Sequence, residues 1–186
     1  MAKKIILLVV VLVLIGGGFF YWWQIQADIR ELNKTLPEGV RVVKSLFGNE
    51  YKVVNKVDGY ELKIPPEWMG IKEIGYIPER TEEGYTATSI GIEGKEGIGR
   101  SVGIDRYKSG RDVGDLGSWA KTNFETFGLM GDFIKDKTGE FDSIKTQENV
   151  HFGGEYIYFF KKDFVIYTIT GGSEDFIRYI ITNGKW

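Results

Sequence analysis

The chain of 186 residues contains no cysteine and only one histidine, His151, and these two shortages exclude several kinds of chemistry. Without cysteine there is no disulfide, no thiolate nucleophile and no lipobox residue that could carry a lipid. A histidine-based metal site needs further ligands at suitable spacing, and the sequence places none around His151. We therefore expect no metal and no other cofactor, and a fold that depends on its core alone.

The chain also lacks an excess of basic residues. Residues 1–36 hold four basic and two acidic groups, so the 24 basic and 26 acidic groups of the whole chain leave 20 and 24 for the remainder, a net charge of −4. Binding to a phosphate backbone needs a concentrated basic face, so we expect no nucleic-acid partner. Proline is scarce and aromatic residues are plentiful, which argues against disorder and favours one folded domain.

The stretch that organises the rest of the chain is the apolar run from Ile5 to Trp23, which contains no charge. As a helix, at about 1.5 Å per residue, it would span roughly 28 Å, close to the hydrocarbon thickness of about 30 Å. The aromatic residues Tyr21–Trp23 close it, where amphipathic rings favour the headgroup layer. We interpret Ile5–Trp23 as an uncleaved, single-pass transmembrane helix whose partner is the lipid bilayer.

Three alternative interpretations of this run are open. Ile5–Ile15 has the length of a signal-peptide core, and Gly16 and Gly18 are small enough to flank a cleavage site. Five aromatic residues follow these glycines, and a mature chain beginning with them would be poorly soluble, which favours the anchor. Gly18-Phe19 resembles a prepilin cleavage pair, but in pilins the apolar helix follows that pair. A buried core helix rarely has so continuous an apolar run.

The charges that flank the run indicate its orientation. Lys3 and Lys4 precede it, whereas Arg30 and Lys34 follow it together with two acidic residues. This small basic excess favours an amino terminus in the cytoplasm and a domain outside it, at the cell membrane. We divide the chain into a cytoplasmic amino terminus (1–4), a transmembrane helix (5–23), a juxtamembrane stalk helix (24–38) and an extracytoplasmic domain (39–186).

Hydrophobic periodicity predicts the elements of the stalk and the domain. Ile25, Ile29, Leu32 and Leu36 recur at helical spacing, and a short coiled-coil seam between two copies is an open alternative to a simple stalk. Beyond residue 40 the period approaches two, and the last part of the chain alternates between strands and helices. We predict strands at 51–54, 60–64, 72–77, 86–93, 100–107, 141–146, 155–160 and 164–170, and helices at 115–127 and 174–181.

This order of elements predicts an α+β fold, with an antiparallel sheet packed between helices and preceded by the transmembrane helix. Asp58-Gly59 predicts a hairpin turn between two strands. Pro65-Pro66 ends the second of these strands, because proline cannot donate a hydrogen bond to a neighbouring strand. We expect Trp68 to fill the core below that corner.

The segment Asp58–Trp68, which reads DGYELKIPPEW, resembles the opening motif G-[YF]-x-[FIL]-x-[YIV]-P-x-x-W of PsbP-like domains. The resemblance continues more weakly through Ser118-Trp119-Ala120 and the hairpin at 156–170, so it covers residues 50–182. It implies an α-β-α sandwich. Members include the extrinsic photosystem II subunit, a nuclear import factor that binds the GTPase Ran, and bacterial envelope proteins. They share binding or assembly rather than catalysis, and no functional residue is carried over.

Four residues are candidates for a ligand or partner surface. Tyr76, Tyr85 and Tyr107 lie on predicted strands and could line an aromatic groove, although aromatic residues on strands usually pack. Lys95 lies in the predicted hairpin tip Gly94–Gly99, which could form the rim of such a groove. None of these residues belongs to a recognisable catalytic motif.

Other motifs are weaker. The glycine-rich stretch Gly91–Gly103 matches neither the phosphate-binding loop nor the dinucleotide pattern, so a hairpin tip is the simpler interpretation. Paired carboxylates such as Glu82-Glu83, or Asp112 with Asp115, could act as acid and base, but at loops and helix starts they are usually solvated or capping. We therefore expect no catalytic residue.

Two functions are compatible with the sequence. The first is a membrane-anchored, non-catalytic extracytoplasmic domain that binds an envelope protein or a small ligand. The second is a carboxylate-dependent hydrolase that acts on cell-envelope material. Two buried acids facing into a cleft would favour the hydrolase, and their absence would favour the binding domain.

Overall fold

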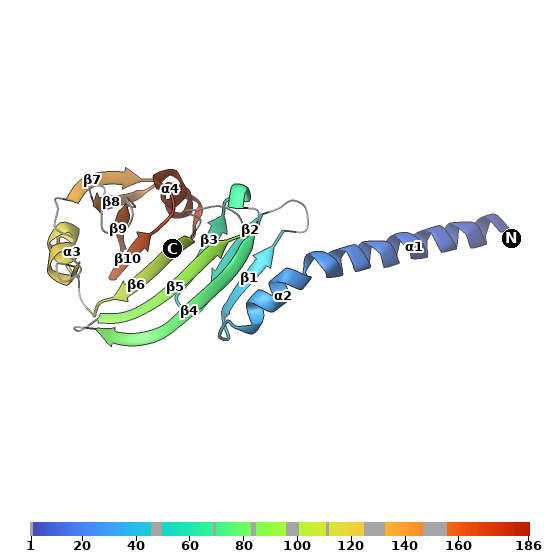
Figure 1. Ribbon diagram of the computed structural model, residues 1–186, viewed down its shortest axis with the longest axis horizontal. Coiled ribbons are helices and arrows are strands. Elements are labelled where there is room, and N and C mark those ends of the chain that lie inside the picture. Colours follow the sequence, from blue (N-terminus) through green and yellow to red (C-terminus); the bar gives the residue numbers. More distant parts are fainter. Residues whose placement is uncertain are drawn as a thin grey trace.

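The computed structural model shows a long helix that projects from a β-rich domain (Figure 1). Helix α1 spans Ala2–Ile25 and continues, after Gln26, into α2 at Ala27–Lys34. The side chains from Val10 to Gln24 are all exposed, and this amino-terminal helix is long and apolar enough to cross a membrane. The structure describes residues 2–45, 50–68, 70–82, 85–95, 101–110, 112–124, 133–146 and 156–186.

The strands of the domain form two antiparallel sheets. The smaller sheet has the order β1-β2-β3, and the larger has the order β4-β5-β6-β10-β9-β8-β7. The α+β class is thereby confirmed, whereas the division into two sheets was not predicted. The strands are β1 Val40–Lys44, β2 Tyr51–Asn55, β3 Tyr60–Ile64, β4 Ile71–Glu82, β5 Tyr85–Gly94, β6 Ser101–Lys108, β7 Phe133–Thr138, β8 Phe141–Thr146, β9 Ile157–Lys162 and β10 Val165–Thr170.

The seven-stranded sheet separates two cores, because alternate residues of each strand point to opposite faces. Phe160 points into the main core, between this sheet and the layer formed by the three-stranded sheet and α4 (Glu174–Asn183). Its neighbour Phe159 points into a second core, below α3 (Leu116–Phe124). Figure 1 shows α3 at the end of the domain that lies farthest from α1.

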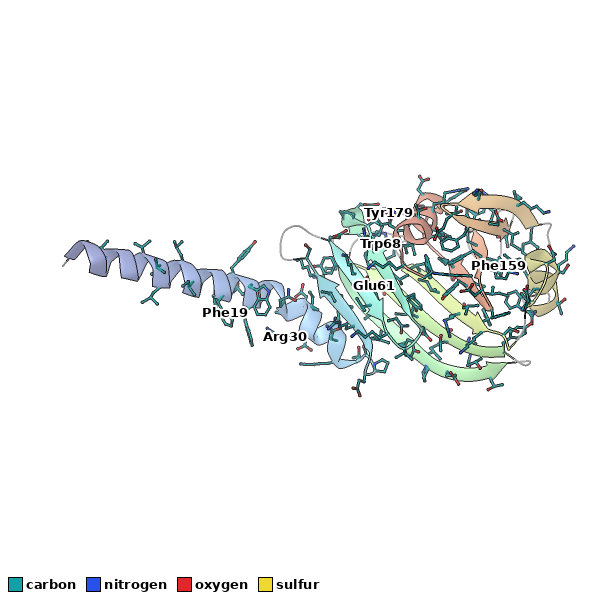
Figure 2. All side chains as sticks on the ribbon, turned by 180° about the vertical axis from the view of Figure 1, so that it is seen from behind. Phe19, Arg30, Glu61, Trp68, Phe159 and Tyr179 are labelled. Carbon is teal, nitrogen blue, oxygen red and sulfur yellow. The ribbon has the colours of Figure 1, made fainter. Side chains whose placement is uncertain are left out.

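The corner after β3 has the predicted architecture. The turn containing Gly59, whose φ is +84°, joins β2 to β3. A short 3-10 helix, η1 (Pro66–Trp68), follows β3. Trp68 is only 3% exposed, and its ring stacks on that of Phe176 in α4 with the centroids 4.0 Å apart. Figure 2 labels Trp68 and also Tyr179, which lies on α4. The prediction that Trp68 fills the core at this corner is confirmed.

A buried polar contact ties the tip of the three-stranded sheet to the larger sheet. The Asp58 carboxylate accepts hydrogen bonds from Asn55 Nδ2 at 2.7 Å and from the Tyr76 hydroxyl at 3.1 Å. Its other oxygen lies 3.6 Å from Arg106 Nη1 on β6. Burial, together with the nearby Asp58 charge, raises the pKa of Tyr76 to about 12. Tyr76 is therefore a neutral donor to Asp58 at physiological pH.

Helix α2 packs against the domain instead of standing free as a stalk. Ile29 is 4% exposed and belongs to the main core, and Leu32 and Leu36 pack against that core. The Asn33 side chain donates to the Val42 carbonyl at 3.0 Å and accepts from the Val42 N–H at 2.7 Å. The apolar stripe predicted from the sequence therefore faces the protein's own core, and α2 belongs to the packed unit.

This packing predicts that removal of α2 destabilises the domain. A fragment that begins at residue 39 should unfold at lower urea concentration than one that begins at residue 26, because it loses the burial of Ile29, worth about 1.5–3 kcal/mol. Urea unfolding followed by tryptophan fluorescence measures the difference. Equal midpoints for the two fragments would contradict the structural role of α2.

A polar cluster holds the start of α4 against the large sheet. Glu174 Oε1 accepts hydrogen bonds from Lys145 Nζ at 2.7 Å, the Tyr158 hydroxyl at 2.8 Å and Arg178 Nη2 at 3.0 Å. Arg178 also donates to Asp136 on β7 at 2.5 Å. The hydrogen bond from Lys145, aided by those from Tyr158 and Arg178, lowers the pKa of Glu174 from 4.5 to about 2.

This cluster predicts a pH-dependent stability. The folded pKa of Glu174 lies below its unfolded value, so its stabilising effect is complete above about pH 4.5 and is lost as the pH falls towards 2. We expect Glu174→Gln to lower the thermal midpoint at pH 7 and to match the parent near pH 2. Circular dichroism melting curves across this range test it, with the exposed Asp175→Asn as the control. A deficit that does not change with pH would contradict the assignment.

Candidate functional site

A groove with a volume of about 530 Å³ crosses the seven-stranded sheet on the face that also carries α3. It is lined by residues of β4, β5, β6 and β9 and by the end of β10. Its floor is a row of three glycines in register on adjacent strands, because Gly75 pairs with Gly91 and Gly91 pairs with Gly103. A strip of bare backbone therefore runs across β4, β5 and β6.

Two of these glycines have no local structural reason to be glycine. A Cβ atom added at Gly75 or Gly91 would meet no described atom within 4 Å, and neither residue has a positive φ. Gly171, at the end of the groove, differs, because its φ is +86° and an added Cβ would lie 2.4 Å from the Ser101 carbonyl oxygen. Glycine inside a strand weakens it and often marks the close approach of a ligand or another backbone.

Polar side chains form the walls beside the glycine floor. Glu73 and Glu93 pair across β4 and β5 at one side, with Ser101 next to them on β6. Lys72 Nζ donates to Glu93 Oε1 at 2.5 Å, and this hydrogen bond raises the pKa of Lys72. Thr170 closes the groove on the β10 side. The walls therefore offer hydroxyl groups and solvated carboxylates rather than a buried catalytic pair.

On the same face of the sheet, the neighbouring row of side chains, which lies closer to α3, is also polar. Arg80 Nη1 donates to the Ser89 hydroxyl at 2.8 Å, and Ser89 in turn donates to Asp105. The Thr168 hydroxyl donates to the other Asp105 oxygen at 3.2 Å. These groups satisfy one another across four strands, so they form a fixed border to the groove.

The structure separates the four residues predicted for a binding surface. Tyr85 and Tyr107 come together, since both rings contact Trp119, with centroids 5.7 and 5.3 Å away. Tyr76 lies on the opposite face of the sheet and contacts Asp58. Lys95 pairs with Asp28 of α2. The two tyrosines pack at the second core, and none of the four residues lines the groove.

The remaining sequence candidates are structural or lie outside the described residues. Asp115 accepts from the Ser118 N–H at 2.8 Å at the start of α3, and this hydrogen bond lowers the pKa of Asp115. Asp112 accepts from Lys161 at 2.9 Å, which lowers the pKa of Asp112. His151, Glu83 and the tip at 96–100 lie outside the described residues.

The chemistry of the groove has to be judged from its own residues, because comparisons with family models, with curated proteins and with solved structures find no match. Its volume lies in the range of about 300–1,000 Å³ that is usual for ligand sites. Backbone CH₂ groups form a flat floor, while Ser101 and Thr170 offer hydroxyls and Glu73 offers an acceptor. This arrangement suits a ligand that lies flat across three strands and forms hydrogen bonds along its edges.

Proposed function

We propose that the protein is a membrane-anchored, non-catalytic binding domain whose ligand lies in the groove across β4, β5 and β6. The observation that carries this proposal is the open floor at Gly75 and Gly91, where glycine weakens two strands although a side chain would have space. The resemblance of Asp58–Trp68 to PsbP-like domains supports it, because that family binds or assembles rather than catalyses.

Binding fits the groove better than hydrolysis. Among the described residues of the groove, the acids Glu73 and Glu93 are solvent-accessible, and Glu93 is already paired with Lys72. A general acid needs a pKa raised by burial, which requires a desolvated carboxyl group. The groove therefore lacks the feature that would favour the carboxylate-dependent hydrolase.

The proposed location is the outer side of the cell membrane. Helix α1 supports an anchor by its length and composition, and Lys3 and Lys4 favour an amino terminus in the cytoplasm. Protease added to intact spheroplasts should then digest the domain. Full protection of the domain, or a mature chain that begins at Phe19, would contradict this topology.

Site-specific photo-cross-linking tests the groove. A photoreactive amino acid at Ser101, in the full chain in its native membrane, should give a discrete cross-linked species, because this position lines the groove. The control position is Phe164, which is 55% exposed at the opposite end of the β9–β10 hairpin. Identical products from both positions would contradict the proposal.

A further inference from the structure

The outer face of the three-stranded sheet is basic, although the domain as a whole is acidic. Alternate residues such as Val42, Val53 and Leu62 point into the main core, so their neighbours point outward. One outward row aligns Arg41 with Val54 and Glu61, and the next aligns Val43 with Lys52 and Lys63. Glu61, which Figure 2 labels, is the one acidic residue among the six residues of these two rows.

The cations of this face lack counter-charges within the described part of the chain. Glu61 already pairs with Lys185 at 3.1 Å. No ion pair with a described residue is formed by Arg41, Lys52 or Lys63. Lys52 stands directly opposite Lys63, and like charges at such cross-strand positions destabilise a sheet. An external anion that contacts this face would relieve the repulsion.

The chain itself places this sheet close to one surface that carries anions. Strand β1 follows α2 after a short connection, and Figure 1 shows α2 and β1 as the parts of the domain next to α1. At the junction between the two helices, the guanidinium of Arg30 on α2 lies 3.8 Å from the centre of the Trp23 ring on α1. Tryptophan is typical of the headgroup layer, so the anchoring proposed above places this junction at the membrane surface.

We propose that the outer face of the three-stranded sheet docks on anionic lipid headgroups of the membrane that holds α1. This inference rests on the membrane anchoring proposed above. Lysine and arginine side chains are attracted to anionic headgroups within a Debye length. Val43, which is 37% exposed, lies beside Lys52 and adds an apolar contact to the same surface.

Docking through this face would leave the groove accessible. The basic face and the groove are separated by the three-stranded sheet, the main core and the seven-stranded sheet, because the groove lies on the α3 side of the latter. The two surfaces therefore face away from each other. Contact with lipid would orient the domain so that its ligand approaches from the side opposite the membrane.

The test uses the full chain in lipid vesicles, and the absence of native cysteine makes single-site labelling simple. A fluorophore on Val43→Cys reports contact with lipids that carry a nitroxide on the headgroup. We expect strong quenching in vesicles of phosphatidylcholine mixed with phosphatidylglycerol, weak quenching in phosphatidylcholine alone, and a loss of the difference at high salt. A label on Phe164→Cys should be quenched little in either vesicle.

Charge reversal supplies the matched control. The triple variant Arg41→Glu, Lys52→Glu and Lys63→Glu should lose the extra quenching, whereas Lys108→Glu, Lys135→Glu and Lys137→Glu, at exposed sites elsewhere, should retain it. Flotation of the vesicles reports anchoring separately, so protein that does not float refutes the anchor. If the protein floats with the vesicles but the label at residue 43 is quenched equally in both vesicle types, the docking proposal is wrong. An acidic protein would then be the ligand expected at this face.

Discussion

Replacement of Trp68 by Ala is expected to destabilise the domain by about 3–5 kcal/mol, the usual cost of removing a large buried aromatic side chain. Trp68 is almost fully buried, and its ring stacks on Phe176, so its loss opens a cavity between η1 and α4. Chemical unfolding of the fragment 26–186 measures the change. Phe164→Ala, at an exposed position, should alter stability by less than about 0.5 kcal/mol.

A cost below about 1 kcal/mol for Trp68→Ala would show that the side chain is not part of the core. It would also contradict the contact between η1 and α4. A cost in the expected range together with an unchanged denaturant slope would place the whole effect on the folded state.

Removal of the Asp58 carboxylate is expected to have an effect of similar size. Asp58→Ala leaves the Arg106 guanidinium in a largely buried position without its counter-charge, and breaking a buried ion pair on one side costs about 3–5 kcal/mol. The hydrogen bonds from Asn55 and Tyr76 are lost as well. The three-stranded sheet should then separate more easily from the seven-stranded sheet, which hydrogen exchange of β2 and β3 would detect.

The matched control for Asp58→Ala is a variant that breaks a pair between an acidic and a basic residue at the surface. Glu61→Ala breaks the exposed pair with Lys185 and should cost less than about 1 kcal/mol. If Asp58→Ala cost no more than this control, the polar contact between the two sheets would contribute nothing measurable to stability.

Local signals predicted much of the fold. The turn at Asp58-Gly59 and the stop at Pro65-Pro66 each have a chemical cause that lies within a few residues. Accordingly β3 falls where the sequence places it. Strand β7 was missed because its residues are largely polar and exposed, and it forms through pairing with β8 after the turn at Gly139.

The assignment of α2 needed tertiary information. Ile29, Leu32 and Leu36 make the same apolar stripe whether the helix faces a second copy, water or its own domain. Only the position of β1 and the main core shows that this stripe packs within the chain. The same limit explains why a single sheet was expected, since strand order depends on contacts between distant segments.

The groove was the least predictable feature. The strands predicted at 86–93 and 100–107 contain Gly91 and Gly103, but the prediction did not show that these glycines pair with each other. A partial signal existed, because Gly91 and Gly103 are equally distant from Gly97 in the sequence. The pairing of Gly75 with Gly91 also depends on a register shift between Ile77 and Arg80, which the sequence does not reveal.

The most direct measurement compares the parent chain with the double variant that carries Gly75→Val and Gly91→Val. Both the stability and the cross-link from Ser101 are measured. Valine suits a strand and its Cβ has open space here, so we expect unchanged or higher stability, by up to about 1 kcal/mol per site. Valine also fills the floor, so the cross-link from Ser101 should disappear. Gly171→Val, which cannot be accommodated, should instead destabilise the fold. An intact cross-link in a stable Gly75→Val, Gly91→Val variant would contradict the groove as the binding site.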